Sequence, residues 1–458
     1  MATLPVCGMM VAEKYKEDIM STIRLYREDV YMKEAEGFIT RKEAVKKGTL
    51  VCLDRSLFFP EGGGQSCDRG TIAGFSVLDV QEKEGQVYHL LDCQPEDLPD
   101  AGSQIPLKQV LDWDLRFDNM QRHCGEHIVS GIFFREYGGV NRGFHMGDQY
   151  MTIDISLEEN PDYDKVTWEM CKHVELLANQ TIWSAAPVNT FRFATRAEAE
   201  ALPLRKALAI DEDISIVCVG NPVTGHAASS PGPAPSKSPA FCSSSLADCV
   251  ACCGTHPSTA AQVGMIKIYK VESNKGMFRI YLEAGKRAFL KYQQQYDVLD
   301  ELGTKLSAGT GDILKKYRAQ QDKNNEARQQ LGMLRRHVIA GEAAKIRQVI
   351  EDDKAAARSE GRKPANLSFE YDVLTVDDLL NLAKELFDVI PKVLFLVHRP
   401  SCTVLLCSSG KPDCGKLVKE NASIYGGKGG GGSTAARAIF TRDEYVDTFI
   451  DLIDKHLR

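Results

Sequence analysis

The sequence contains no long hydrophobic run. Hydrophobic residues make up 43% of its 458 residues, which is enough for ordinary buried cores. No apolar stretch, however, reaches the ~20 residues that a membrane-spanning helix needs. The N-terminal segment has a short apolar patch without the preceding basic residues of a secretory signal. We therefore expect no membrane partner, and the length predicts about three domains.

A paired cysteine framework is also missing. The 14 cysteines are scattered along the chain, and the adjacent Cys252 and Cys253 cannot easily bond to each other. In a chain of this size, unpaired thiols are typical of a reducing compartment. We therefore expect a cytoplasmic protein.

The chain lacks the overall positive charge that is common in nucleic-acid-binding proteins, because its net charge is −7. The charge is unevenly distributed, however. Between Asp312 and Lys363 there are 13 Lys/Arg and 8 Asp/Glu, a local excess of +5. A local basic face is sufficient for phosphate contacts. A solvated helix of mixed charge explains the same pattern equally well.

Two short segments supply the side chains of a candidate metal site. RHCGEHI places His123 and His127 four residues apart, so that they share one face of a helix. CVACCGTHP places Cys252 and His256 four residues apart. Imidazole and thiolate are preferred Zn²⁺ ligands, and four of them complete a tetrahedral site. Four protein ligands are typical of structural zinc, whereas catalytic zinc usually keeps an open position, so both roles remain open.

The order of three motifs resembles a known family. LFFPEGGGQSCDRG (Leu57 to Gly70) comes before the HxxxH pair, and CxGTH follows it. This order resembles the editing domain of alanyl-tRNA synthetase, and in particular the free-standing AlaX-type alanyl-tRNA editing proteins. Near the C-terminus, IYGGKGGGGSTAARAIF (Ile424 to Phe440) resembles the Gly-rich core of the DHH-associated domain. The resemblance extends from about Tyr26 to the C-terminus.

The resemblance implies a zinc-dependent aminoacyl-tRNA deacylase that clears tRNA(Ala) mischarged with serine or glycine, in trans. His123, His127, Cys252 and His256 would bind zinc. The expected pocket residues are Gly62, Gly63, Gly64 and Gln65. Gln65 would hydrogen-bond a polar amino-acid side chain or the ribose. Since the chain begins at the N-terminal β-rich region, we expect no aminoacylation.

Two other functions remain open. One is a tRNA- or RNA-binding protein with a structural zinc and no catalytic activity. The other is a zinc hydrolase that acts on a different small ester or amide. Glu126, between the two histidines, does not match the HEXXH arrangement of a general base, and we expect a solvated helix residue there.

The Gly-rich segment near the C-terminus resembles a phosphate cradle. It lacks the GxxxxGK[ST] spacing of a P-loop, and the chain has no DHH motif, so neither ATP binding nor phosphoesterase activity is expected. The resemblance implies contacts with the tRNA backbone and allows a homodimer formed through the C-terminal region. The expected tRNA-binding residues are Lys428, Gly429, Gly430, Gly431, Gly432 and Arg437.

The predicted fold class is α+β with four parts. They are an N-terminal β-barrel over residues 1–110, an α/β editing domain over 111–285, a helical hairpin or coiled-coil arm over 286–363, and a C-terminal α/β Gly-rich domain over 364–458. A Pro/Ser-rich insertion over residues 221–248 has too few large apolar residues to order itself and should loop out.

Three local elements are predicted within these parts. Apolar spacing predicts a helix from Arg116 to Tyr137, which the two glycines that follow should end. The segment from Met265 to Gly285 has the alternation of a β-hairpin. In the arm, Thr310 is the expected N-cap of the second, longer helix.

Overall fold

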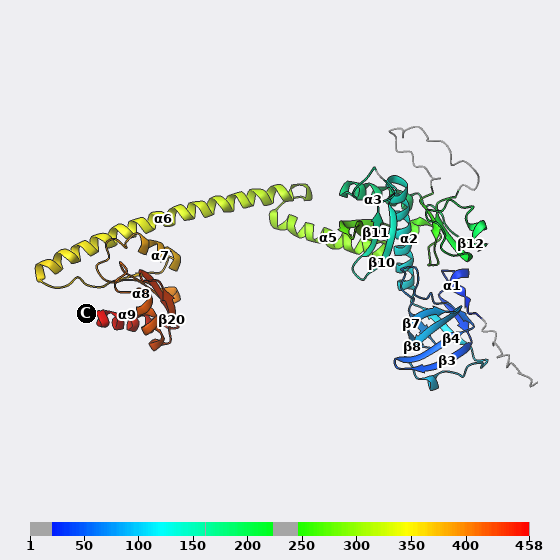
Figure 1. The fold of residues 1–458 in the computed structure, drawn as a ribbon, viewed down its shortest axis with the longest axis horizontal. Helices are drawn as coiled ribbons and strands as arrows, with labels where there is room; N and C mark the ends of the chain where they lie inside the picture. Colours follow the sequence, from blue (N-terminus) through cyan, green and yellow to red (C-terminus); the bar gives the residue numbers. More distant parts are fainter. Residues whose placement is uncertain (1–20, 161, 223–245, 458) are drawn as a thin grey trace, which may run out of the picture. The chain divides into compact units, whose positions relative to one another are not determined.

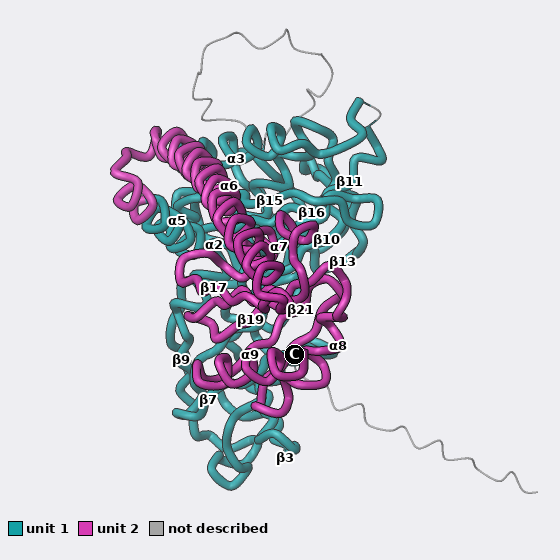
Figure 2. Tube along the Cα trace, turned by 90° about the vertical axis from the view of Figure 1, so that its left-hand side faces the viewer, with its two compact units in different colours: residues 1–299 teal, residues 300–458 magenta. Residues whose placement is uncertain are grey.

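The computed structural model describes residues 21–160, 162–222 and 246–457 of the chain (Figure 1). The chain divides into two compact units, residues 1–299 and 300–458 (Figure 2). Helices and sheets occur in both, which confirms the α+β class. Within the described ranges, no helix combines the length and apolar character needed to cross a membrane. The first twenty residues and most of the predicted insertion lie outside those ranges.

An antiparallel sheet forms the N-terminal part of the first unit. Its strand order is β2-β9-β6-β7-β8-β4-β3. Apolar side chains alternate along these strands and build one core that includes Phe58, Ile72 and Val80. The bounds are β2 Glu34–Gly37, β3 Ile39–Val45, β4 Gly48–Leu53, β6 Gly70–Ile72, β7 Phe75–Lys83, β8 Gln86–Leu91 and β9 Leu107–Leu111. A short parallel pair, β1 Ile23–Arg24 and β5 Arg55–Ser56, and helix α1 Leu25–Glu28 complete this region.

The predicted β-barrel is wrong, because this sheet does not close. Its edge strands β2 and β3 follow each other in the chain and meet at Phe38, yet no ladder joins them among the described residues. Asp54 occupies the corner instead. The Phe38 amide donates to Asp54 Oδ1 at 2.7 Å, and the Asp54 amide donates to the Phe38 carbonyl at 3.0 Å. These bonds satisfy the groups that would otherwise start a closing ladder.

A long helix, α2 (Trp113–Tyr137), connects this sheet to the next layer. The Asp112 side chain caps its first turn by accepting from the Leu115 amide, and Gly138 ends it in a left-handed conformation. The helix predicted over 116–137 is therefore confirmed. A fully buried ion pair fixes its start, because Arg116 Nε donates to Asp68 Oδ2 at 2.9 Å.

Two further sheets surround α2 in the first unit. One has the order β10-β11-β16-β15, and the other has the order β12-β13-β14. Their faces pack on α2 and α3 around Ile128, Ile132 and Phe133. The bounds are β10 Val140–Met146, β11 Met151–Ser156, α3 Trp168–Trp183, β12 Val188–Thr195, α4 Arg196–Ala199, β13 Glu212–Val219, β14 Asp248–Ala251, β15 Ile266–Asn274 and β16 Met277–Ala284. The hairpin predicted before residue 285 is β15–β16, so that prediction is confirmed.

The predicted arm consists of α5 (Gly285–Leu306) and α6 (Ile313–Glu360). The expected Thr310 cap lies in a 3₁₀ turn, and Asp312 precedes α6 without a side-chain cap. The C-terminal half of α6 packs against α7 through Ile339, Ile346 and Leu379. A five-stranded sheet of order β17-β18-β19-β21-β20 follows. The bounds are β17 Leu367–Tyr371, α7 Val376–Lys384, β18 Leu394–His398, β19 Thr403–Cys407, α8 Cys414–Asn421, β20 Lys428–Gly431, β21 Ala435–Ile439 and α9 Asp443–Leu457.

Candidate metal centre and its cavity

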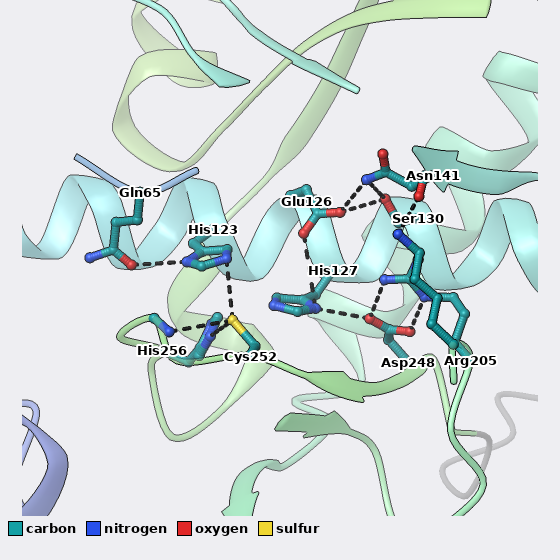
Figure 3. A network of polar contacts seen from close by, with 12 residues as sticks. Gln65, His123, Glu126, His127, Ser130, Asn141, Arg205, Asp248, Cys252 and His256 are labelled. Carbon is teal, nitrogen blue, oxygen red and sulfur yellow. Dashed lines mark hydrogen bonds and ion pairs between the residues drawn. The ribbon is translucent and has the colours of Figure 1, made fainter. Parts of the chain in front are cut away.

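The structure brings the four predicted zinc ligands together. The candidate ligand atoms of His123, His127, Cys252 and His256 all lie within 4.8 Å of one another. Cys252 Sγ is 3.4 Å from Nε2 of His123 and 3.4 Å from Nε2 of His256. The first two residues lie on adjacent turns of α2, and the other two follow β14 (Figure 3). Three imidazoles and one thiol match the donor chemistry that Zn²⁺ prefers.

The nitrogen atoms of these imidazoles support a metal site. His123 Nδ1 is 2.9 Å from Gln65 Oε1, and His127 Nδ1 is 2.9 Å from Asp248 Oδ2. In both rings the Nδ1–H donates to an oxygen, which leaves Nε2 free to bind a metal ion. His127 Nε2 is buried and has no hydrogen-bond partner among the described residues. A bound cation would satisfy this atom, so the donor set fits zinc.

The local electrostatics favour the metal-binding form of the thiol. Burial raises the pKa of Cys252, but the surrounding imidazoles outweigh burial and hold that pKa well below its usual value. Burial, only partly offset by Cys252, lowers the pKa of His256 to about 4. Burial also lowers the pKa of His127, but Cys252 and Glu126 outweigh it and raise the pKa well above 6.5.

A cavity of about 640 Å³ opens beside the candidate metal centre. His123, His127 and Cys252 contribute to its wall. The wall contains charges of both signs. The basic residues are Arg27, Arg142, Arg205 and Lys206, and the acidic residues are Glu126, Glu212 and Asp213. A cavity of this size with charged groups in its wall can hold a small charged ligand or one end of a larger one.

The triple-glycine turn borders this cavity only in part. Gly63 lines it, whereas Gly62 and Gly64 are not among the lining residues. Gly62 and Gln65 form reciprocal backbone hydrogen bonds of 3.1 and 3.0 Å, which close the turn. Gly64 has a φ of +83°, and a Cβ there would lie 2.6 Å from the Phe144 ring. Glycine is therefore required at residue 64 by both conformation and space.

Gln65 does not face the cavity as expected. Its side chain is buried, and both its amide oxygen and its amide nitrogen contact neighbours within the protein. Besides His123 Nδ1, its Oε1 accepts from the Thr255 amide at 3.1 Å, and its Nε2 donates to Thr255 Oγ1 at 2.9 Å. These contacts let Gln65 orient a candidate metal donor, while the expected hydrogen bond to a substrate side chain stays a prediction.

The role of Asp248 was not predicted, because residue 248 falls at the end of the predicted insertion. Asp248 instead begins β14 and is fully buried at the side-chain level. Its Oδ1 accepts from Arg205 Nε at 2.6 Å, while its Oδ2 accepts from His127 Nδ1. Burial raises the pKa of Asp248, but Arg205 and His127 outweigh it and hold the pKa below its usual range. The sequence signal that could have identified Asp248 is its position as an acidic residue four positions before the candidate ligand Cys252.

The expectation of a solvated Glu126 is wrong. Glu126 is only 5% exposed. It accepts hydrogen bonds from Ser130 and Asn141 (Figure 3). Glu126 follows His123 by three residues, a spacing that shares one helix face, and this could have indicated an inward side chain.

The predicted tRNA-binding residues lie in the second unit. The Gly-rich run is not a loop, because Lys428, Gly429, Gly430 and Gly431 form the exposed edge strand β20. Gly432 follows in the turn, where its amide donates to the Ala435 carbonyl at 2.9 Å. Arg437 is exposed on β21 and pairs with Gly430 in the ladder. Their tRNA contacts remain a prediction.

Comparison with known proteins agrees with this site. Residues 243–281, which include Cys252 and His256, match the family model described as "Threonyl and Alanyl tRNA synthetase second additional domain". The chain is similar to the alanyl-tRNA editing protein AlaX-L of Pyrococcus horikoshii, with 27% identity over 95% of this chain and 99% of that protein. It is also similar to the alanine–tRNA ligase of Caldivirga maquilingensis, with 27% identity over 96% of this chain but only 45% of the ligase.

A third relative is more similar over a shorter region. The alanyl-tRNA editing protein AlaX-M of Methanosarcina barkeri is 34% identical over 186 residues, which cover 39% of this chain and 72% of that protein. These matches define an editing domain of the kind that synthetases and free-standing proteins share. The chain belongs to the family of AlaX alanyl-tRNA editing proteins.

Proposed function

We propose that this protein hydrolyses the ester bond of tRNA(Ala) mischarged with serine or glycine, in trans and with a bound zinc ion. The names of its relatives and its family membership support the substrate class. The donor set supports zinc. The reaction would take place in the cytoplasm, as the unpaired cysteines indicate.

The observation that carries this proposal is the position of the cavity. Three of the four candidate donors line it, so a ligand in the cavity would meet the metal centre directly. A purely structural zinc requires no adjacent cavity, which makes the alternative of an inactive RNA-binding protein less favoured. When bound, zinc would polarise the ester carbonyl or lower the pKa of a water molecule.

The residues of the chain have separate roles in this proposal. Gln65 and Asp248 fix the two imidazoles of α2, so that the donors are oriented before substrate arrives. Gly63 lets the backbone approach the ligand closely. The cations of Arg142 and Lys206 on the cavity wall would face the terminal nucleotide of the tRNA, whose phosphates are negative.

A deacylation assay tests the activity. Wild-type protein is incubated with Ser-, Gly- and Ala-tRNA(Ala), each with and without a zinc chelator, and zinc is added back to the chelated sample. We expect the serine or glycine ester to be hydrolysed, Ala-tRNA(Ala) to be spared, and zinc to restore the activity that the chelator removes.

The other outcomes identify the alternatives. Binding of tRNA without hydrolysis of any ester would favour the RNA-binding protein with a structural zinc. Hydrolysis of small esters regardless of the tRNA would favour a general zinc hydrolase. His123→Ala protein is the matched control, since it should lose both zinc and deacylation if the site is assigned correctly.

The second unit is proposed to bind the tRNA backbone. Lys428 and Arg437 are exposed on neighbouring strands. The glycines of β20 have no side chains, so their backbone amides are accessible to a ligand. The mixed but locally basic sequence of α6 could add phosphate contacts from the same unit. Non-specific backbone contacts of this kind fit a chain whose net charge is negative.

A further inference from the structure

Glu126 is a buried carboxylate in the cavity wall that the proposed zinc site does not use. It lies on α2 between His123 and His127, and only 6% of its side-chain surface is exposed. One carboxylate oxygen is held in place. Oε1 accepts from Ser130 Oγ at 2.6 Å and from Asn141 Nδ2 at 2.7 Å. Asn141 Nδ2 also donates to Ser130 Oγ at 2.9 Å, so the three side chains form a closed network.

Among the described residues, no group donates a hydrogen bond to the other oxygen of Glu126. Within the described ranges, the nearest charged or ionisable partner of Oε2 is His127 Nδ1, at 3.9 Å. That nitrogen already contacts Asp248 Oδ2 at 2.9 Å. In the described part of the chain, Oε2 therefore accepts no hydrogen bond, although the carboxylates of largely buried residues are normally paired.

The neighbouring cations are occupied elsewhere. Arg205 donates to both oxygens of Asp248, at 2.6 and 3.1 Å. Lys206 donates to the carbonyl of Asn141. Neither forms an ion pair of 4.0 Å or less with Glu126 in the part of the chain that the structure describes. The negative charge of Glu126 is thus available to a cationic group that enters the cavity.

We propose that Glu126 binds the α-ammonium group of the aminoacyl ester. This inference rests on the proposed deacylase function, because it assigns a site to one part of that substrate. Every aminoacyl-tRNA carries a free ammonium group one carbon away from the ester carbonyl. A fixed carboxylate beside a metal donor would hold this group while the carbonyl lies toward the metal centre, which orients the ester for hydrolysis.

This role makes the site selective at the amino group. An ester that carries a hydroxyl in place of the ammonium has the same shape but cannot form the ion pair. The carboxylate would therefore favour aminoacyl esters over α-hydroxyacyl esters, independently of how the amino-acid side chain is recognised. Glu126 is then a substrate-binding residue, whereas Ser130 and Asn141 position it.

The test combines one substitution with one change in the substrate. Glu126→Gln keeps the size of the side chain and an oxygen for Ser130 and Asn141 but removes the charge. Each protein is assayed on Ser-tRNA(Ala) and on the same tRNA after nitrous acid has converted the ammonium to a hydroxyl. Glu169→Gln is the matched control, because Glu169 is an exposed carboxylate on α3 of the same unit and is not among the residues that line the cavity.

We expect Glu126→Gln to lower kcat/KM on Ser-tRNA(Ala) by about 10-fold or more, as for the loss of a charge-assisted hydrogen bond. The rate on the hydroxyacyl ester should stay within about twofold of wild type. Glu169→Gln should change neither rate. Zinc content should be equal in all three proteins.

Two results would overturn the inference. An equal loss on both esters, or a loss of zinc, would show that Glu126 acts on the structure of the site and not on the ammonium group. No loss on either ester would show that Glu126 has no role in the reaction. If wild-type protein hydrolyses neither ester, the proposed deacylase function fails instead, so the two failures are distinguishable.

Discussion

Asp248 determines how one candidate metal donor is presented. Its carboxylate accepts from His127 Nδ1 and is itself held by Arg205, so the imidazole can offer only Nε2 to a metal ion. Oxygen acceptors of this kind orient the ring and raise its basicity. The contact joins α2 to the first residue of β14, and it therefore also fixes the start of the segment that carries Cys252.

The first prediction concerns this carboxylate. Asp248→Ala should weaken zinc affinity by roughly 10- to 100-fold, because the His127 ring loses its orienting acceptor. Competition with a chromophoric zinc chelator measures the change. Asp213→Ala is the control, since Asp213 is an exposed carboxylate on the same cavity wall. Unchanged affinity in the Asp248 variant would contradict the orienting role of this carboxylate.

The second prediction concerns Gln65, whose amide bonds only to His123 and Thr255 in the described structure. Because the Gln65 side chain is buried and both its Oε1 and its Nε2 bond within the protein, Gln65→Ala should slow deacylation of Ser-tRNA(Ala) and Gly-tRNA(Ala) by the same factor. Thr255→Val should shift both rates in the same direction to a smaller extent. A loss confined to the serine ester would restore the role that the sequence suggested.

Among the helices and strands, α2 was the most predictable. Its apolar spacing, its Asp112 cap and the Gly138 stop are all local signals, and they give the helix and the facing histidines directly. The metal donors could be predicted because each pair lies within five residues of sequence. Asp248 and Gln65 could not be given their roles in this way, since their contacts with α2 span 121 and 58 residues.

Whether the N-terminal sheet closes into a barrel could not be predicted from the sequence. The alternation in β7 and β8 indicates strands but not whether the two edge strands pair. At the corner between these strands, Phe38 hydrogen-bonds to Asp54, which is distant in sequence. The Gly-rich run was misjudged for a related reason, because glycine usually weakens strands. In β20 the pairing with β21 outweighs that preference.

The third prediction concerns the exposed edge formed by β20 and β21. If Lys428 and Arg437 neutralise tRNA phosphates, replacing both by alanine should weaken tRNA binding. It should also reduce the slope of log Kd against the logarithm of the salt concentration, by roughly 0.7–0.9 for each phosphate that is no longer neutralised. Binding is measured at several salt concentrations. Lys384→Ala, which removes an exposed cation from α7, is the control. An unchanged slope in the double variant would exclude this edge as a phosphate site.

At the scale of the whole molecule, the two compact units differ in chemistry. The candidate metal centre and its cavity lie entirely in the unit of residues 1–299, and the Gly-rich edge lies in the unit of residues 300–458. Each unit has hydrophobic clusters of its own. This separation suggests that ester hydrolysis and backbone binding can be measured independently in one chain.

The fourth prediction follows from the distance in sequence between the metal donors. His123 and Cys252 are 129 residues apart, so they meet only when the first unit is folded. Zinc that binds the folded state alone should stabilise it by about 2.7 kcal/mol at a free concentration 100 times its Kd. In denaturant, we expect the unfolding midpoint of the first unit to rise with free zinc while that of the second stays constant. Equal shifts in both would contradict this assignment.

Because the donors are far apart in sequence, a bound metal ion would also report whether the first unit is correctly folded. A chain cleavage or a mistranslated residue between His123 and Cys252 would lower the affinity for zinc if it disturbs the structure of β14 or α2. Zinc occupancy would then measure, in a single number, what fraction of molecules retains a correctly assembled first unit. A protein that guards the accuracy of translation would in this way carry a readout of the accuracy of its own synthesis.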